Sequence, residues 1–162
     1  MLRKITLAAI LGLGLISSPA FGKDITDEKS GIVISLPEGD GWKLEEGKVT
    51  TATCEEGISI SIIRFEKDMP STIIKRMADE FARFFSDAKA KADDIDKITV
   101  HGMQVDKVTG YGMKDEKPVK FTVILVCKDN TSTVAIIAYG GETAFKRHLR
   151  EIDETFDSIK PK

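Results

Sequence analysis

Two segments decide the fold: Val119-Lys-Phe-Thr-Val-Ile-Leu-Val-Cys127 and, after a short polar turn, Thr133-Val-Ala-Ile-Ile-Ala-Tyr139. Both are rich in β-branched residues and predict two long strands joined by a turn. Successive side chains of a strand point to opposite faces of its sheet, and here both sets are apolar. A strand that is apolar on both faces must be covered on both faces. The pair therefore predicts a central sheet with packed material on either side.

Shorter segments before this pair alternate more strictly between apolar and polar residues, which places them nearer an edge of the sheet. Turn-forming residues separate them, and three of the early strands (32–36, 49–54 and 58–62) are expected to form an antiparallel meander. The expected strands are 32–36, 42–44, 49–54, 58–62, 98–100, 103–113, 119–127 and 133–139.

Two amphipathic helices are available as covers for the sheet. Apolar residues recur at steps of three and four from Ile73 to Ala88, after an expected start at Pro70 and Ser71, and again from Phe145 to Ile159. Such spacing is typical of a helix with one apolar stripe. The most economical arrangement places one helix on each face. The expected fold class is α+β, a three-layer α/β/α sandwich around a mostly antiparallel central sheet.

Residues 1–22 have the three parts of a secretory signal peptide. Arg3 and Lys4 form a positive start, Ile5 to Ile16 is apolar and uncharged, and Ala20-Phe21-Gly22 has the small residues of a cleavage site. The apolar run of about 12 residues is shorter than the roughly 20 that a transmembrane helix needs. We therefore expect cleavage after residue 22.

Cleavage would leave residues 23–162 as one domain of ordinary size, either periplasmic or secreted. The whole chain has 24 basic and 26 acidic residues, a net charge of −2, and loss of Arg3 and Lys4 would make it 22 − 26 = −4. A slightly acidic chain of mixed charge argues against nucleic acid or an anionic lipid surface as a partner. We expect no membrane span after signal cleavage.

Cys54 and Cys127 are the two cysteines of the chain. In an oxidising compartment, two lone cysteines often form a disulfide. The alternative is a pair of buried thiols, because free cysteine is among the most buried residue types. Both possibilities are open at the level of sequence, and we expect one intramolecular disulfide between Cys54 and Cys127.

A search for catalytic or metal-binding patterns finds none that is complete. His101 and His148 each lack a second histidine at the three- or four-residue distance of a helical metal site, and no Gly-x-Ser-x-Gly nucleophile motif occurs. The cluster Asp93, Asp94 and Asp96 lacks the glycine and distal glutamate of a calcium-binding loop. We therefore expect no catalytic residue, no metal ligand and no cofactor.

Three further features are interpreted as structural. Gly110-Tyr111-Gly112 lies within a strand and predicts a β-bulge. Gly140-Gly141 predicts a strand-to-helix turn, because it lacks the remaining residues of a phosphate-binding loop. Trp42 could anchor a partner, but its position after a turn favours packing beneath the first hairpin.

The order of several motifs resembles the PsbP-like and DcrB-like family of small exported domains. These motifs are Ile34-Ser-Leu-Pro-Glu-Gly-Asp-Gly-Trp42, Thr99-Val-His-Gly-Met-Gln-Val105 and Ser158-Ile-Lys160. The first of them is two residues longer than the family pattern. The resemblance covers residues 30–160 and implies a central antiparallel sheet with helices on both faces. It also implies accessory or binding roles, such as those of a photosystem subunit or a periplasmic protein used in phage uptake, and it assigns no functional residue.

Export, this resemblance and the lack of a catalytic pattern together predict a non-enzymatic accessory or protein-binding domain. Its expected partner is another protein of the cell envelope. The alternative is a periplasmic carrier that holds a small apolar ligand or lipid between sheet and helix. An enzyme assembled from scattered side chains is a third hypothesis, and a polar cleft around His101 or His148 would support it.

Overall fold

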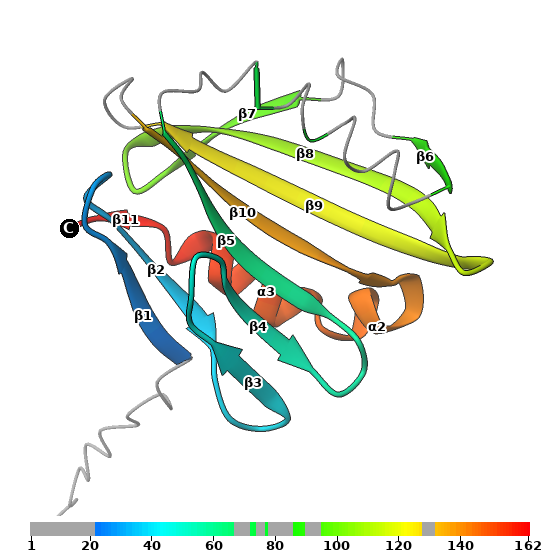
Figure 1. The fold of residues 1–162 in the computed structure, drawn as a ribbon. Coiled ribbons are helices and arrows are strands. Elements are labelled where there is room, and N and C mark those ends of the chain that lie inside the picture. The colour runs from blue at the N-terminus through cyan, green and yellow to red at the C-terminus, as the bar shows by residue number, and fades with distance from the viewer. Residues whose placement is uncertain (1–21, 67–71, 74–76, 78–85, 90–94, 128–131) are drawn as a thin grey trace, which may run out of the picture.

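A computed structural model describes residues 22–66, 72–73, 77, 86–89, 95–127 and 132–162 of the chain. Within these residues the chain forms two antiparallel sheets and the helices α2 and α3 (Figure 1). Among the described residues, no helix has the length and hydrophobicity that crossing a bilayer requires.

The large sheet has the strand order β3-β4-β5-β10-β9-β8-β6, and β7 also pairs with β8. Its strands are β3 (Trp42–Glu45), β4 (Thr50–Cys54), β5 (Ser59–Glu66), β6 (Ser86–Lys89), β7 (Ile95–Val100), β8 (Met103–Lys114), β9 (Lys117–Cys127) and β10 (Ser132–Gly141). The predicted strand pair is confirmed as β9 and β10, which lie in the middle of the sheet. They pair over most of their length, from Thr133 opposite Cys127 to Gly141 opposite Val119.

A small second sheet, which the sequence did not predict, has the order β1-β2-β11. Its strands are β1 (Gly22–Asp27), β2 (Ile32–Pro37) and β11 (Lys160–Pro161). The prediction that the first of these segments belongs to a meander with β4 and β5 is therefore wrong, because β2 pairs with β1 and β11 and it is β3 that lies beside β4. An ion pair between Asp27 at the end of β1 and Arg64 in β5 connects the two sheets.

The final amphipathic segment forms two helices, α2 (Glu142–Arg147) and α3 (Leu149–Asp157). The break lies at His148, whose φ of −95° and ψ of 16° depart from helical values. Backbone hydrogen bonds continue across the break, from His148 N to Ala144 O (3.0 Å) and from Ile152 N to His148 O (3.1 Å). Figure 1 shows both helices along one side of the large sheet, with α3 in contact with β2.

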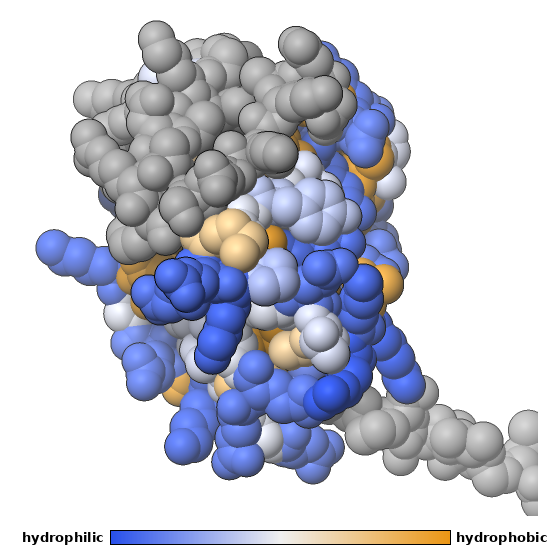
Figure 2. Space-filling model, turned by 90° about the vertical axis from the view of Figure 1, so that its right-hand side faces the viewer, coloured by the Kyte–Doolittle hydropathy of each residue, from blue (hydrophilic) through white to orange (hydrophobic). Residues whose placement is uncertain are grey.

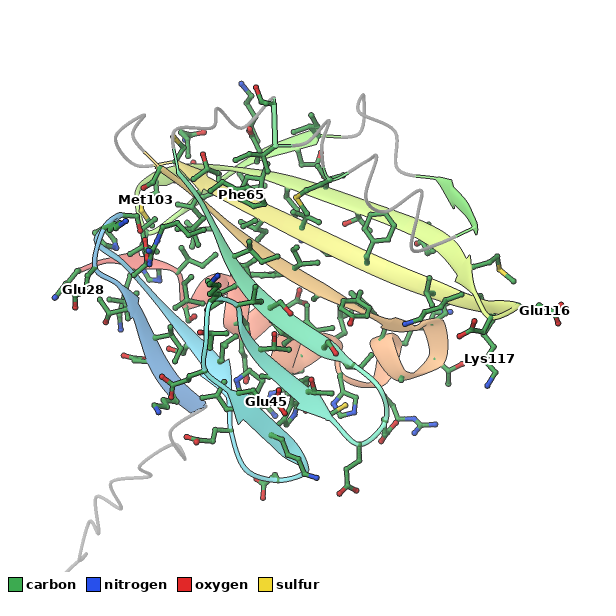
Figure 3. The ribbon with its side chains drawn as sticks, in the orientation of Figure 1. Glu28, Glu45, Phe65, Met103, Glu116 and Lys117 are labelled. Carbon is green, nitrogen blue, oxygen red and sulfur yellow. The ribbon has the colours of Figure 1, made fainter. Side chains whose placement is uncertain are left out.

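Both faces of the large sheet are buried, as the apolar pattern of β9 and β10 predicts. We call the face under α2 and α3 the first face, and the opposite one the second face. The first-face core includes Ile60, Ile124, Val126, Val134, Ile136, Phe145, Ile152 and Phe156. The second-face core contains Ile73, Met77, Val119, Phe121, Val123, Leu125, Ala135 and Ile137. Figure 3 shows side chains in the space between the large sheet and the helices α2 and α3.

The helix predicted after Pro70 lies largely outside the described residues. Thr72, Ile73 and Met77 are described and helical, and the last two pack in the second-face core. The fold is thus a mostly antiparallel β-structure with short helices, and packed apolar side chains lie on both faces of its large sheet.

The predicted disulfide between Cys54 and Cys127 is contradicted, because the two cysteines are not bonded to each other. Thr53 is in register with Phe121 through β5 and β10. Cys127 lies six residues further along β9, about 20 Å at a rise of ~3.3 Å per residue, whereas a disulfide needs Cα atoms within about 7 Å. Cys54 also packs on the first face, whereas Cys127 shares the alternation of the second-face residues of β9. The spacing of the two cysteines in the sequence indicates neither their distance along the sheet nor the face on which each one lies.

The predicted bulge at Gly110-Tyr111-Gly112 does not occur in the pairing with β9, but the pairing of β8 with β6 is irregular there, between Met113 opposite Ser86 and Tyr111 opposite Lys89. These residues continue the regular pairing with β9, with Gly110 opposite Phe121 and Gly112 opposite Val119. A Cβ atom at Gly110 would lie 2.2 Å from the Phe121 ring. The glycine therefore makes room for an aromatic ring of the second-face core. The predicted turn at Gly140-Gly141 is confirmed, since residue 141 caps α2.

Candidate functional site

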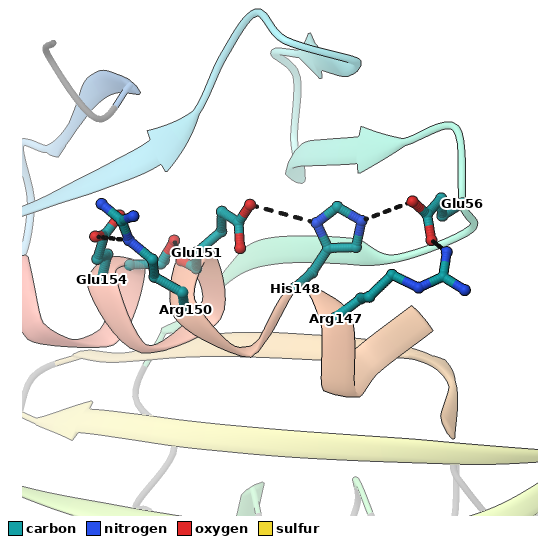
Figure 4. A network of polar contacts seen from close by, with 7 residues as sticks. Glu56, Arg147, His148, Arg150, Glu151 and Glu154 are labelled. Atoms are coloured by element: carbon teal, nitrogen blue, oxygen red, sulfur yellow. Dashed lines mark hydrogen bonds and ion pairs between the residues drawn. The ribbon is translucent and has the colours of Figure 1, made fainter. Parts of the chain in front are cut away.

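His148 lies between two carboxylates at the break between α2 and α3 (Figure 4). Its Nε2 is 3.6 Å from Oε1 of Glu56, which belongs to the loop between β4 and β5. Its Nδ1 is 3.5 Å from Oε1 of Glu151 in the first turn of α3. The imidazole thus connects a loop of the large sheet to the final helix.

The indole of Trp42 packs against the same imidazole. The ring centroids are 5.5 Å apart, and the planes meet at 86° in an edge-to-face arrangement. Trp42 is only 8% exposed, which confirms the packing role predicted for it. The contact adds β3 to the elements that meet at His148.

Two ion pairs extend this network along the surface. Arg147 Nη1 lies 2.5 Å from Glu56 Oε2, and Arg150 Nε lies 2.7 Å from Glu154 Oε1. The hydrogen bond and the negative charge of Glu154 raise the pKa of Arg150. Exposed pairs of this kind contribute little to folding.

The geometry at His148 supports a structural role. A catalytic or metal-binding histidine must present a ring nitrogen to a substrate or metal. Here both ring nitrogens are buried, and each faces its own carboxylate on opposite edges of the ring. One ion on a ring nitrogen could therefore not reach both carboxylates. No set of three metal-ligating side chains occurs in the described part of the chain.

The other sequence candidates also have structural surroundings or lie outside the described residues. His101 is in the turn between β7 and β8 with a φ of 45°, and its Nε2 lies 2.9 Å from the carbonyl oxygen of Asp157 at the end of α3. Asp93 and Asp94 lie outside the described residues. Asp96 is in β7, opposite Lys107 of β8.

A group of exposed and half-buried side chains lies at the free end of the β8–β9 hairpin. Tyr111 is opposite Lys120 and Met113 is opposite Pro118, and paired residues of antiparallel strands point to the same face. We call these four side chains the hairpin face. Tyr111 is 51% exposed, and Lys120 Nζ lies 5.6 Å from its ring centroid and 5.3 Å from that of buried Phe145.

Helix α2 borders the hairpin face. Lys146 Nζ donates a hydrogen bond to Glu142 Oε1 at 2.7 Å. This bond and the charge of Lys146 lower the pKa of Glu142, and the charge of Lys120 lowers it further. Leu149, at the start of α3, is 44% exposed. Figure 2 shows this side of the molecule, where apolar and pale side chains lie among charged ones.

Comparison with known proteins places the fold. No family model matches the chain, and no curated protein matches it. Among solved structures, cyanobacterial PsbP from Synechocystis sp. PCC 6803 matches with a TM-score of 0.64 at 12% identity, over 96% of this chain and 99% of that one. The chain has a PsbP-like fold.

Two other structures share the PsbP-like fold. LpqN, involved in cell envelope biogenesis of Mycobacterium tuberculosis, matches with a TM-score of 0.58 at 13% identity over 86% of this chain and 90% of its own. The Saccharomyces cerevisiae Ran-binding protein Mog1p matches with a TM-score of 0.55 at 11% identity over 86% and 94%. At these identities the likeness concerns the fold, and the motifs that suggested a PsbP-like architecture are confirmed to that extent.

Sequence reasoning missed the partners of His148 and the hairpin face of this PsbP-like domain. Glu151, three residues after His148, is a local signal that helical spacing provides. Glu56 is 92 positions away and has no such signal. Tyr111 was considered only for its flanking glycines, although its alternation with buried residues of β8 already predicts an outward side chain.

Proposed function

We propose that this chain is an exported, non-enzymatic accessory domain that binds another protein of the cell envelope through the hairpin face. The observation that carries the proposal is the exposure of Tyr111 beside Lys120, Met113 and Pro118. Tyrosine and methionine are enriched at protein interfaces, and tyrosine is among the residues that dominate binding energy. A half-exposed tyrosine ring would lose its contact with water in such an interface.

Export is supported by the signal-like residues 1–22 and by the cell-envelope role of LpqN, which shares the fold. Strand β1 begins at Gly22, so a cut after this residue leaves Lys23 to Asp27 in their pairing with β2. We also propose that the helix expected after Pro70 covers the second face, because Ile73 and Met77 already pack there.

A binding role is favoured over an enzymatic one by the closed surroundings of His148. It is favoured over the carrier alternative by the packing beneath α2 and α3. Phe145 and Ile152 are each 1% exposed and belong to one continuous core with Ile124 and Ile136 of the sheet. Interiors packed in this way hold few voids larger than a water molecule. Native mass spectrometry of the protein from its host tests the alternative, since a carrier would show a reproducible added mass.

Site-specific photo-cross-linking in the host tests the proposed surface. Tyr111 is replaced by p-benzoylphenylalanine, and Val49, exposed to 42% on the opposite edge of the sheet, receives the same replacement as a control. We expect one discrete adduct from position 111 and none from position 49. Equal adducts from both positions, or none from position 111, would overturn the proposal.

A further inference from the structure

The hairpin that carries the proposed binding surface is positively charged in an acidic chain. Residues 107–120 contain four lysines and two acidic residues, a charge of 4 − 2 = +2, whereas the whole chain has 24 − 26 = −2. These residues are Lys107, Lys114, Asp115, Glu116, Lys117 and Lys120. These positive charges therefore belong to the same hairpin as exposed Tyr111.

Two of these lysines point to the first face, beside the helices. Lys107 Nζ lies 5.9 Å from the ring centroid of Phe156, and Lys120 Nζ lies above Tyr111 and Phe145. Within the described part of the chain, neither ammonium group forms an ion pair with a carboxylate. An aromatic face stabilises an exposed cation by only about 0.5–1 kcal/mol. Lys107 has Asp96 of β7 directly opposite it, so Lys120 is the cation that remains for an acidic group of a partner.

The acidic residue on α2 is already engaged. Glu142 is hydrogen-bonded to Lys146 at 2.7 Å, and this pair is neutral as a unit. Because Glu142 is paired with Lys146, the positive charge of Lys120 is not balanced by Glu142 at the border between the hairpin and α2.

The residues at the tip of the β8–β9 hairpin are unfavourable for the structure that they form. Lys114 and Lys117 lie directly opposite each other, and like charges in that position destabilise a strand pair. Asp115 and Glu116 form the turn with φ values of 49° and 62°, where glycine or asparagine is strongly preferred. Figure 3 shows Glu116 and Lys117 projecting from this tip. Such departures are expected at sites selected for function, because folding alone does not favour them.

We infer that the partner presents an acidic protein surface to the hairpin face, with a carboxylate for Lys120 and an apolar side chain for Tyr111. This inference rests on the proposed function. An anionic membrane is the competing class of surface, and a protein is favoured because tyrosine and methionine are enriched at protein interfaces.

The test uses the processed protein purified from its host and an array of 12-residue peptides with equal apolar content and a net charge of −4, 0 or +4. We expect the acidic peptides to bind and to shift the backbone amide resonances of Tyr111 and Lys120. The exchange Lys120→Glu should weaken their binding about tenfold, as should a rise from 50 to 500 mM NaCl, because the contact is largely electrostatic. Lys43→Glu makes the same charge change on β3 and should alter the affinity by less than about twofold.

Binding that is independent of peptide charge, or equal affinities of the Lys120→Glu and Lys43→Glu proteins, would overturn the inference. So would binding to vesicles of equal parts phosphatidylglycerol and phosphatidylcholine without binding to any peptide. If Lys120→Glu leaves the Tyr111 cross-link in the host unchanged, the acidic partner is wrong and the proposed surface stands. If position 111 gives no adduct in the host and peptide binding does not depend on charge, both the acidic partner and the proposed surface are wrong.

Discussion

The His148 network and the hairpin face contain the same kinds of groups in opposite settings. The first has Trp42, Arg147 and Glu56 around the imidazole, and the second has Tyr111 and Lys120 with Glu142 at its border. His148 is 17% exposed and has both ring nitrogens buried, whereas Tyr111 is 51% exposed. Composition therefore does not distinguish a structural cluster from a binding surface. Exposure of the polar and aromatic atoms does.

The two regions also differ in what they join. The His148 network brings together β3, the β4–β5 loop and both helices, which are distant in sequence. The hairpin face belongs to two consecutive strands and borders one helix. Substitutions in the first region should therefore change stability, and substitutions in the second should change binding.

The largest effect on stability is expected from Trp42→Ala. It removes a buried indole from the first-face core and the ring contact of His148, and should lower the free energy of unfolding by about 3–5 kcal/mol. Urea denaturation measures the change. The control Leu149→Ala removes an exposed apolar side chain and should stay within about 0.5 kcal/mol of the parent protein. Similar losses in both proteins would remove the distinction between the two regions.

A smaller loss is expected from Gly110→Ala, behind the hairpin face. The added Cβ would meet the Phe121 ring at 2.2 Å, so the ring or the strand must move, at a cost of about 1–3 kcal/mol. Gly47→Ala is the matched control, because its Cβ would meet only Val49 O at 3.6 Å. Its stability should change by less than about 0.5 kcal/mol. A Gly110→Ala protein as stable as the control would show that the ring does not occupy this space.

The same contrast explains what could be predicted from the sequence. The buried centre of the sheet was predicted because alternation along β9 and β10 shows both faces of each strand locally. Strand β1 has no such pattern, since Ile25 is its one apolar residue between positions 23 and 27, and its pairing with Ile34 depends on tertiary contacts. The small sheet was missed for that reason.

The incorrect predictions concern relations across strands. The glycines around Tyr111 predict a bulge in β8, whereas the irregular step lies in its pairing with β6, and Gly110 faces the Phe121 ring, which only the register of β8 with β9 specifies. The disulfide was expected because the compartment is oxidising. Whether two cysteines bond depends instead on the face of the sheet on which each lies and on their distance along the strands. The site behaved in the same way: Glu151 follows His148 by one helical turn, but Glu56 comes near it only through the fold.

A comparison of neighbouring residues tests the structural role of the network. His148→Ala removes the ring that packs on Trp42 and leaves Glu56 and Glu151 without the group between them, so stability should fall by about 1–2 kcal/mol. Arg147→Ala removes only an exposed ion pair and should cost less than about 0.5 kcal/mol. Thermal unfolding of both variants at pH 6 gives the difference. A greater loss for Arg147→Ala would mean that the surface ion pair, and not the imidazole, holds the loop.

The smallest effect concerns the charges at the border of the hairpin face. Lys146→Ala should raise the pKa of Glu142 toward its usual value, because the hydrogen bond and charge of Lys146 are the main causes of its lowering. Lys120→Ala should raise that pKa less, because only its charge acts. Carboxyl carbon shifts in an NMR titration measure both. If the Lys120 variant gave the larger change, Glu142 would be the chief partner of Lys120. This cation would then already be neutralised within the domain, and the case for an acidic partner would weaken at its central residue.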